Sequence, residues 1–373
     1  MKAWPVLGIS LIEIILLLAH WFLFHTWIEF WNSPSPATIL ALRVVLLVLA
    51  FSFIVAALLG FRFANPFIVF IYKIAAVWLG FLNYLFLSAC LSWLAWYAWL
   101  ASGLSPNPAS ARPVIAGTLS VIALAAGIYG LLNARWIRVR RIPVTLPGLP
   151  ESWRGRRAVL LSDLHLGNIN GVAFSRRLVA LAAGLRPDIV FIPGDLFDGS
   201  KADLDKLAAP FKELAAPFGV YFSTGNHEEF GGTERYLAAV TRAGIRVLQN
   251  EKVTVDGLHI AGVPFGDSTS PIRLHAALEG MGLSRDEANI LLNHMPSRLP
   301  IVERAGVSLQ VSGHTHGGQI FPFTLPTRRV FGRFTYGLQR FGSLHVYTSS
   351  GAGTWGPPMR VGTHPEIVLL EFA

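Results

Sequence analysis

Residues 158–165 read AVLLSDLH, a short apolar run that ends in an aspartate and a histidine. An apolar run of this length, bounded by polar residues, is typical of a buried strand. Asp163 and His165 are two positions apart on the extended chain that leaves the strand. Their side chains therefore point to the same side and can reach one ion together. This stretch predicts a strand whose carboxyl end carries a pair of metal ligands.

The same arrangement recurs four times farther along the chain. Further buried strands are predicted at 188–192, 219–223, 289–292 and 308–311, and a polar motif follows each of them. These motifs supply the candidate site residues Asp195, Asp198, Asn226, His227, His294, His314 and His316. Helices are predicted between the strands, at 175–185, 202–216 and 233–243. The alternation predicts a layered α/β domain, whose functional residues lie in loops at strand ends.

Each motif alone also has a purely structural interpretation, as a turn or a helix cap. Five motifs in this order, each closing an apolar strand, favour a metal site instead. The ligand atoms are carboxylate, amide and imidazole, with no thiolate among them. Such a set suits Mn²⁺, Fe²⁺ or Zn²⁺ better than Ca²⁺ or a soft metal.

From about Ile137 to its end, the chain resembles the calcineurin-like metallophosphoesterase family, in its membrane-linked YkuE- and YaeI-like branch. The resemblance lies in the five motifs, in the Gly-Gly-Gln at 317–319 and in the glycine- and proline-containing stretch at 351–367. It implies a four-layer α/β-β/α sandwich, the metallophosphoesterase domain, with a centre for two divalent ions, most often Mn²⁺. Two such ions lower the pKa of a water and position the oxygens of a phosphoryl displacement.

The resemblance also implies a role for each motif residue. The first ion would be held by Asp163, His165 and His316, and the second by Asn226, His294 and His314. Asp195 would bridge the two ions, and His227 would donate a proton to the leaving group. Asp198 would pair with His227 and raise its pKa; alternatively, Asp198 only caps the helix that follows.

A loop at 320–341 mixes phenylalanines with arginines. Rings beside guanidinium groups suit an amphiphilic phosphate substrate. We therefore predict that Arg328 and Arg329 bind substrate, and Arg360 is a further candidate phosphate contact. The alternative is that the rings of this loop pack beneath the sheet.

Residues 1–134 contain only seven charged side chains, although the chain holds 31 Lys and Arg and 22 Asp and Glu. This contrast predicts a transmembrane region at 1–134 and a catalytic domain at 135–373. Four stretches are long and apolar enough to span a bilayer, at 4–24, 37–61, 66–100 and 113–132. A cleaved signal peptide is not expected, because the first run is too long and no small-residue cleavage site follows it.

Lysine and arginine are concentrated on one side of the four predicted spans. The positive-inside rule then predicts that the catalytic domain faces the cytoplasm, in a multi-pass protein of a bacterial-type inner membrane. The polar residues at membrane depth are Glu13, His20, Lys73 and Asn83. We interpret them as interhelical hydrogen-bonding or snorkelling groups rather than a transport path, since no internal repeat accompanies them.

The net charge of +9 does not indicate nucleic-acid binding, because no basic run is interleaved with aromatic residues. The expected function is a membrane-anchored, two-metal phosphohydrolase that cleaves a phosphodiester or pyrophosphate bond by attack of an activated hydroxide. Its expected partners are the bilayer and a phosphorylated lipid, such as UDP-2,3-diacylglucosamine or a phospholipid. A phosphodiesterase acting on soluble substrates and a non-catalytic membrane sensor or scaffold are the alternatives.

Overall fold

The computed structural model describes residues 3–32, 34–103, 110–230 and 232–373. The chain forms two compact units. One reaches to Leu132 and includes the short segment Gly356–Met359, and the other contains Asn133–Trp355 and Arg360–Ala373.

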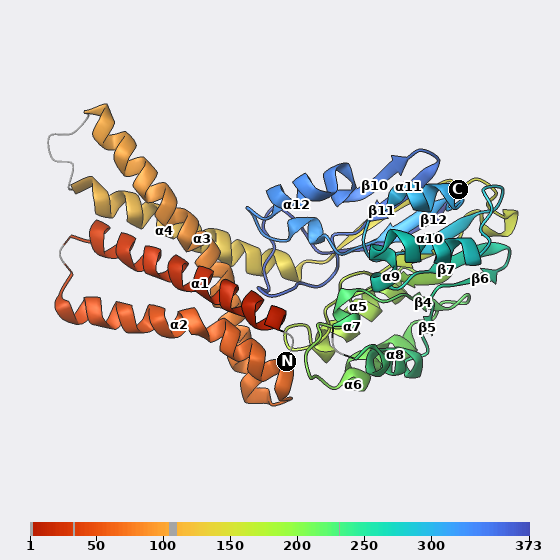
Figure 1. The fold of residues 1–373 in the computed structure, drawn as a ribbon, viewed down its shortest axis with the longest axis horizontal. Coiled ribbons are helices and arrows are strands. Elements are labelled where there is room, and N and C mark those ends of the chain that lie inside the picture. Colours follow the sequence, from red (N-terminus) through yellow and green to blue (C-terminus); the bar gives the residue numbers. More distant parts are fainter. Residues whose placement is uncertain (1–2, 33, 104–109, 231) are drawn as a thin grey trace. The chain divides into compact units, whose positions relative to one another are not determined.

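The first unit is built from four long helices (Figure 1), α1 (Ala3–Phe30), α2 (Pro36–Arg62), α3 (Pro66–Ser102) and α4 (Ala111–Arg135). All four are long and apolar enough to cross a membrane. This confirms the four predicted helices, including a single helix of 37 residues where the third span is unusually long. Proline in the first turn of α2 and of α3 suits a helix start, because the N–H that proline lacks has no partner there.

Polar side chains join α1 to α3. The Nε1–H of Trp78 donates to Nε2 of His20 at 2.9 Å, and the Nε1–H of Trp93 donates to the hydroxyl of Thr26 at 2.9 Å. Nδ1 of His20 lies 2.7 Å from the carbonyl of Leu16 and donates to it, which makes the imidazole neutral. His20 is therefore an interhelical hydrogen-bonding group, as expected from the sequence.

A short segment from the C-terminal part of the chain packs on α3. Gly80 of α3 is buried, and a Cβ there would collide with the sulfur of Met359 and lie 3.2 Å from Pro357. Met359 is itself fully buried. The absence of a side chain at position 80 therefore allows this segment to contact the helix.

The second unit contains two six-stranded sheets. The first sheet has the order β1 (Arg138–Val144), β12 (Glu366–Phe372), β2 (Arg157–Leu160), β3 (Ile189–Ile192), β4 (Val220–Phe222) and β5 (Arg246–Val247). The second has the order β10 (Gly337–Phe341), β11 (Leu344–Thr348), β9 (Leu309–Ser312), β8 (Asn289–Leu292), β7 (Leu258–Gly262) and β6 (Glu251–Val255).

Helices cover the outer faces of the two sheets (Figure 1). The first sheet packs against α5 (Val172–Gly184), α6 (Leu204–Ala208) and α8 (Thr233–Arg242), and the second against α10 (Pro271–Gly280) and α11 (Leu299–Arg304). Side chains of β2 alternate between these layers: Val159 faces the helices, and Ala158 and Leu160 face the other sheet. The result is the four-layer α/β-β/α sandwich that the sequence predicts.

The predicted strands occur within one or two residues of their expected positions. The predicted helix at 202–216 is instead divided into α6 and the 3₁₀ helix η3 (Ala209–Glu213). Pro210 lies at the start of η3, where its ring and missing N–H prevent α6 from continuing. The pairs β2–β3, β3–β4 and β8–β9 are parallel, so the motifs that follow these strands meet at common sheet edges.

Candidate metal centre

Three residues from the first and the fifth motif lie within ligand distance of one another. Nε2 of His165 lies 3.0 Å from Nε2 of His316, which in turn lies 3.4 Å from Oδ1 of Asp163. These three residues form one compact group that could hold a metal ion. It contains the residues that the sequence predicts for the first ion.

A second group lies around Asp195, the predicted bridging residue. Its Oδ2 lies 3.2 Å from Nε2 of His294 and 3.8 Å from Nε2 of His165. Nδ1 of His314 lies 2.9 Å from Oδ1 of Asn226, and the His314 ring lies 5.1 Å from that of His294. All seven predicted ligands are thus in one neighbourhood, with Asp195 between the two groups.

The donor atoms of this neighbourhood fit a bound cation. Nδ1 of His294 lies 3.2 Å from the carbonyl of Pro193 and donates to it, which leaves the lone pair of Nε2 facing inward. Nε2 has no hydrogen-bond partner among the described residues, yet it lies near the carboxylates of Asp195 and, at 4.0 Å, Asp163. In this tautomer the Nε2 lone pair and the two carboxylates face one another, an arrangement that either a metal cation or a proton between them stabilises. Asp/His clusters of this kind suit divalent metals.

The pKa values of the group reflect the same concentration of buried charge. Burial raises the pKa of Asp163 to about 6 and lowers that of His165 to about 3. Burial also acts to lower the pKa of His294, but the carboxylates of Asp195 and Asp163 outweigh it and raise that pKa to about 9. Burial acts to raise the pKa of Asp195, yet the facing His294 holds it well below its usual range. The carboxylates thus stabilise positive charge at this place.

The backbone at the ligands is unusual. Asp163, His165, Asp195, His314 and His316 all have positive φ, between 46° and 68°. Non-glycine residues rarely adopt this left-handed conformation, which costs about 1–3 kcal/mol at each position and is concentrated at functional sites. At these five positions the ligands themselves, and not glycines, take the left-handed conformation.

Glycines contribute close approach instead. A Cβ at Gly313 would collide with the carboxylate of Asp163, and one at Gly225 would collide with that of Asp195. These two glycines let the loops after β9 and β4 pass directly against the two carboxylates. Any larger residue there would displace a predicted ligand.

His227 lies beside the metal ligands, but its predicted partnership with the Asp198 carboxylate is wrong. Nδ1 of His227 lies 3.0 Å from the backbone carbonyl of Asp198 and donates to it. The Asp198 carboxylate instead accepts from the backbone N–H groups of Asn168 and Ser200, each at 2.8 Å. Burial raises the pKa of Asp198.

Glu228, to which the sequence analysis assigns no role, supports two of the ligand loops. It is fully buried and accepts hydrogen bonds from the backbone N–H groups of Asp195 (3.0 Å), Phe197 (3.0 Å) and Gly225 (2.8 Å). Burial, with the charge of Asp195 nearby, raises its pKa to about 7. Glu228 accepts from the N–H of Gly225, the N-cap residue of α7 (Asn226–Glu229), as the glutamate of a capping box does, and a glutamate three residues after a strand-end glycine is the signal by which this role could have been found.

The three predicted substrate arginines lie in different environments. Arg360 is fully buried, and its Nη2 donates to the carbonyls of Ser350 at 2.7 Å and Gly353 at 2.6 Å. A guanidinium enclosed in this way does not face substrate, so the prediction for Arg360 is corrected: it supports the loop beside His316, whose Nδ1 lies 3.3 Å from Nη2. Arg328 and Arg329 are exposed on α12 (Thr324–Phe331).

Aromatic side chains surround the ligands. Phe230, 75% exposed, and Trp355, 60% exposed, lie with ring centroids 5.6 and 6.3 Å from that of His227. Phe331 and Phe265 lie 6.1 and 5.6 Å from the ring of His314. These four residues are called the aromatic rim below.

Comparison with known proteins agrees with this site. The model of the calcineurin-like phosphoesterase family matches residues 156–318, which include all seven predicted ligands. The chain belongs to the calcineurin-like phosphoesterase family, and the resemblance seen in the sequence is confirmed. It is accordingly a metal-dependent phosphoesterase by family.

Several relatives are similar over most of the chain. A transmembrane protein with metallophosphoesterase domain from Danio rerio is 33% identical over 311 residues, which cover 78% of this chain and 70% of that protein. The uncharacterized metallophosphoesterase YkuE of Bacillus subtilis is 30% identical over 272 residues, which cover 69% of this chain and 94% of that protein. A solved dimetal phosphatase from Danio rerio aligns with a TM-score of 0.38 and 12% identity, over 53% of this chain and 88% of that one. With its four apolar helices and its transmembrane relatives, the chain is a membrane protein.

Proposed function

We propose that this chain hydrolyses a phosphodiester or pyrophosphate bond in a lipid-linked substrate, at a two-metal centre held by the seven ligands described above. Asp163, His165 and His316 would hold one ion, Asn226, His294 and His314 the other, and Asp195 both. When bound, such ions supply an activated water and neutralise the charge of the transferring phosphoryl group.

His227 would supply the proton that the leaving oxygen needs. Because Nδ1 donates to the carbonyl of Asp198, Nε2 is the ring nitrogen left to face the leaving oxygen. One ring nitrogen of His227 lies within 4.8 Å of ligand atoms of His165 and Asp195. Only half-buried, the ring is accessible to a substrate bound there. A positioned imidazole is the usual group for this proton transfer.

The aromatic rim is the observation that supports a lipid-linked substrate. Large apolar side chains exposed to water are costly unless they meet an apolar partner, and contiguous ones often mark a binding surface. Phe230 and Trp355 flank the proposed proton donor, so apolar groups of a substrate would lie beside the bond that is cleaved. The four spans would keep the enzyme in the membrane where such a substrate is concentrated.

The experiment compares a diacylated substrate with a small one. Purified protein with Mn²⁺ is assayed on UDP-2,3-diacylglucosamine, on a phospholipid panel and on bis-p-nitrophenyl phosphate. The double variant Phe230→Ser/Trp355→Ser should lose at least about tenfold in kcat/KM on the preferred diacylated substrate and much less on bis-p-nitrophenyl phosphate. Ile272→Ser is the matched control, because Ile272 is 82% exposed on α10 and belongs to no part of the site.

Two results would contradict the proposal. An equal loss on both substrates would favour a phosphodiesterase acting on soluble substrates. No hydrolysis of any substrate by metal-loaded wild-type protein would favour a sensor or scaffold that only binds.

A further inference from the structure

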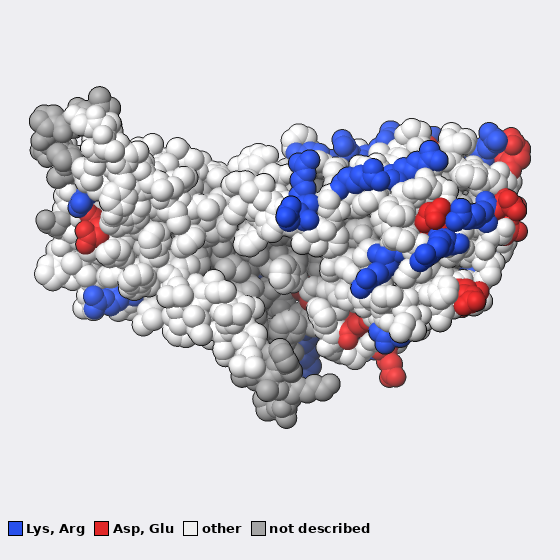
Figure 2. Space-filling model, turned by 45° about the horizontal axis from the view of Figure 1, so that its top comes forward, with Lys and Arg blue, Asp and Glu red and all other residues white. Residues whose placement is uncertain are grey.

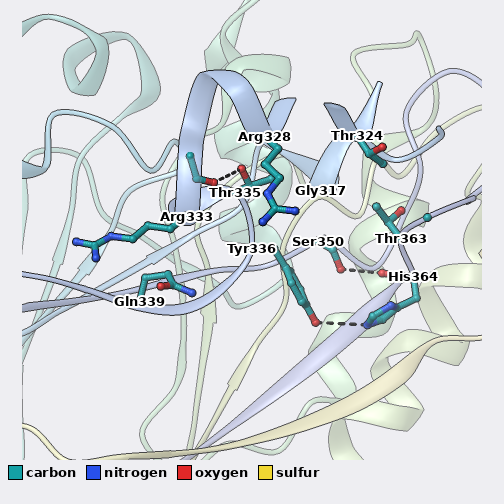
Figure 3. Close-up of a pocket in the computed structure, with 12 residues that line it drawn as sticks. Gly317, Thr324, Arg328, Arg333, Thr335, Tyr336, Gln339, Ser350, Thr363 and His364 are labelled. Atoms are coloured by element: carbon teal, nitrogen blue, oxygen red, sulfur yellow. Dashed lines mark hydrogen bonds between the residues drawn. The ribbon is translucent and has the colours of Figure 1, made fainter. Parts of the chain in front are cut away.

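A second polar cavity lies beneath α12, apart from the predicted metal ligands. It has a volume of about 440 Å³, and none of the seven ligands lines it (Figure 3). Its lining contains Arg328, Arg333 and His364 but no aspartate or glutamate. The hydroxyls of Thr324, Tyr336 and Thr363 add further polar groups. The two guanidinium groups, with the hydroxyl of Thr324 as a further donor, suit an anion rather than a cation.

Arg328 is the part of this lining that is available to a ligand. In the described parts of the chain, its guanidinium makes no ion pair or hydrogen bond. Figure 3 shows it directed toward the side of the cavity where Tyr336 and Ser350 lie. Arg333, in contrast, extends toward Gln339, and its Nη2 donates to the carbonyl of Arg340 at 2.9 Å. A guanidinium with all donors available can bind a phosphate in bidentate geometry.

The surroundings of the cavity carry positive charge. Burial lowers the pKa of His364, and the nearby guanidinium groups of Arg138, Arg140 and Arg360 lower it further. The acid that contacts the cavity wall, Glu366, is fully buried and accepts a hydrogen bond from the hydroxyl of Tyr336 at 2.7 Å. Figure 2 shows many Lys and Arg side chains on the surface of this unit. An anion in the cavity would therefore meet a favourable field.

The segment that covers the cavity is apolar on its outside. Phe321, Phe323, Leu325 and Val330 are between 44% and 74% exposed, and no residue of α12 is buried. A short helix with exposed apolar side chains beside arginines is typical of segments that lie in a membrane interface.

We propose that this cavity binds the phosphate headgroup of an anionic lipid, with Arg328 as its principal ligand and the exposed side chains around α12 in contact with the acyl chains. None of the seven predicted metal ligands lines this cavity, although Gly317 directly follows His316, and the proposed lipid binding goes beyond the proposed hydrolysis. A soluble phosphate ester has the same anionic group but no acyl chains. Contacts of the acyl chains with the exposed side chains around α12 would therefore distinguish a lipid from a soluble ester.

Binding to purified, metal-loaded full-length protein in dodecyl maltoside tests the proposal. Three probes are titrated: dioctanoyl phosphatidic acid, dioctanoylglycerol and glycerol 3-phosphate, with mass spectrometry to verify that the probes stay intact. We expect phosphatidic acid to bind at least tenfold more tightly than either of the others. Arg328→Gln should weaken that binding at least tenfold, and Arg329→Gln, the same charge change on the neighbouring residue outside the cavity lining, at most two- to threefold.

Three outcomes would overturn the proposal. Equal losses in the Arg328 and Arg329 variants would mean attraction to the general surface charge. Equal binding of glycerol 3-phosphate and phosphatidic acid would mean a site for soluble esters. Loss of binding in Asp195→Asn with no loss in Arg328→Gln would place the lipid at the metal centre. None of these results depends on whether a lipid is also hydrolysed.

Discussion

The carboxylate of Glu228 accepts a hydrogen bond from the backbone N–H of Asp195 at 3.0 Å. One buried acidic residue therefore fixes the backbone position of another. The same carboxylate also binds the amides of Phe197 and Gly225, and thereby fixes the loops after β3 and β4 to each other. We expect Glu228→Gln to lower the melting temperature and the metal content together, because an amide NH₂ would face a backbone donor and cost about 1–3 kcal/mol. Thermal melts with and without Mn²⁺ measure this.

Glu234→Gln is the matched control for that variant. Glu234 is exposed in the first turn of α8 and belongs to none of the groups of residues that could hold a metal ion. If Glu228→Gln melts and binds Mn²⁺ like this control, Glu228 does not organise the site.

Asp195→Asn should abolish hydrolysis and lower metal content, since one carboxylate serves both ligand groups. Its Oδ2 faces His294 and His165, and its Oδ1 accepts from the backbone N–H of His227 at 3.0 Å. Metal analysis and hydrolysis of bis-p-nitrophenyl phosphate check this. Two bound ions with retained activity in the variant would disprove the bridging role.

His227→Ala should retain its metal while activity falls on the order of 10²–10⁴-fold. The loss should be smaller for p-nitrophenol esters than for alkyl esters, because a good leaving group needs little protonation. Rates on a series of esters of graded leaving-group pKa measure the difference. Equal losses across the series would remove His227 from the role of proton donor.

Asp198→Asn separates the two interpretations of that residue. Its carboxylate binds two backbone amides, while its carbonyl, which the substitution keeps, holds His227. We expect a lower melting temperature, from a loss of about 1–3 kcal/mol, and an unchanged dependence on the leaving group. A dependence like that of His227→Ala would instead indicate a direct carboxylate–imidazole pair.

The α/β unit is expected on the cytoplasmic side of the membrane. Arg135, at the end of α4, and Arg138, Arg140 and Arg141 in β1 follow the last span directly, and positive residues there favour the cytoplasm. A C-terminal alkaline phosphatase fusion should be inactive and a fluorescent-protein fusion bright. The reverse pattern would place the site outside the cytoplasm.

The sequence predicts the strands and the ligand motifs well because both are local patterns. An apolar run predicts a buried strand. A polar residue directly after the run lies at the edge of the sheet, whichever position the strand takes in that sheet. The environments of Arg360 and Phe334 are set by distant parts of the chain instead. Arg360 is enclosed by the carbonyls of 350–353, and Phe334 packs on Phe341 and the core beneath α11. Charge and ring content in the 320–341 loop could not distinguish a surface contact from a buried one.

Asp198 illustrates the same limit at shorter range. The sequence brings it correctly beside His227, but the atom that makes the contact is a carbonyl, which every residue has. Whether the carboxylate or the carbonyl of Asp198 faces the imidazole depends on where the amides of Asn168 and Ser200 lie. It therefore depends on the paths of two loops.

The two hydrogen bonds between α1 and α3 also bear on how the protein is made. His20 and Trp78 are 58 residues apart, and Thr26 and Trp93 are 67 apart. At roughly 5–20 residues per second, the ribosome needs about 3 to 12 seconds to add the partner of His20 after His20 itself. Throughout that interval α1 holds a polar ring whose final partner does not yet exist. The first helix thus gains these two hydrogen bonds only after the third helix has been synthesised.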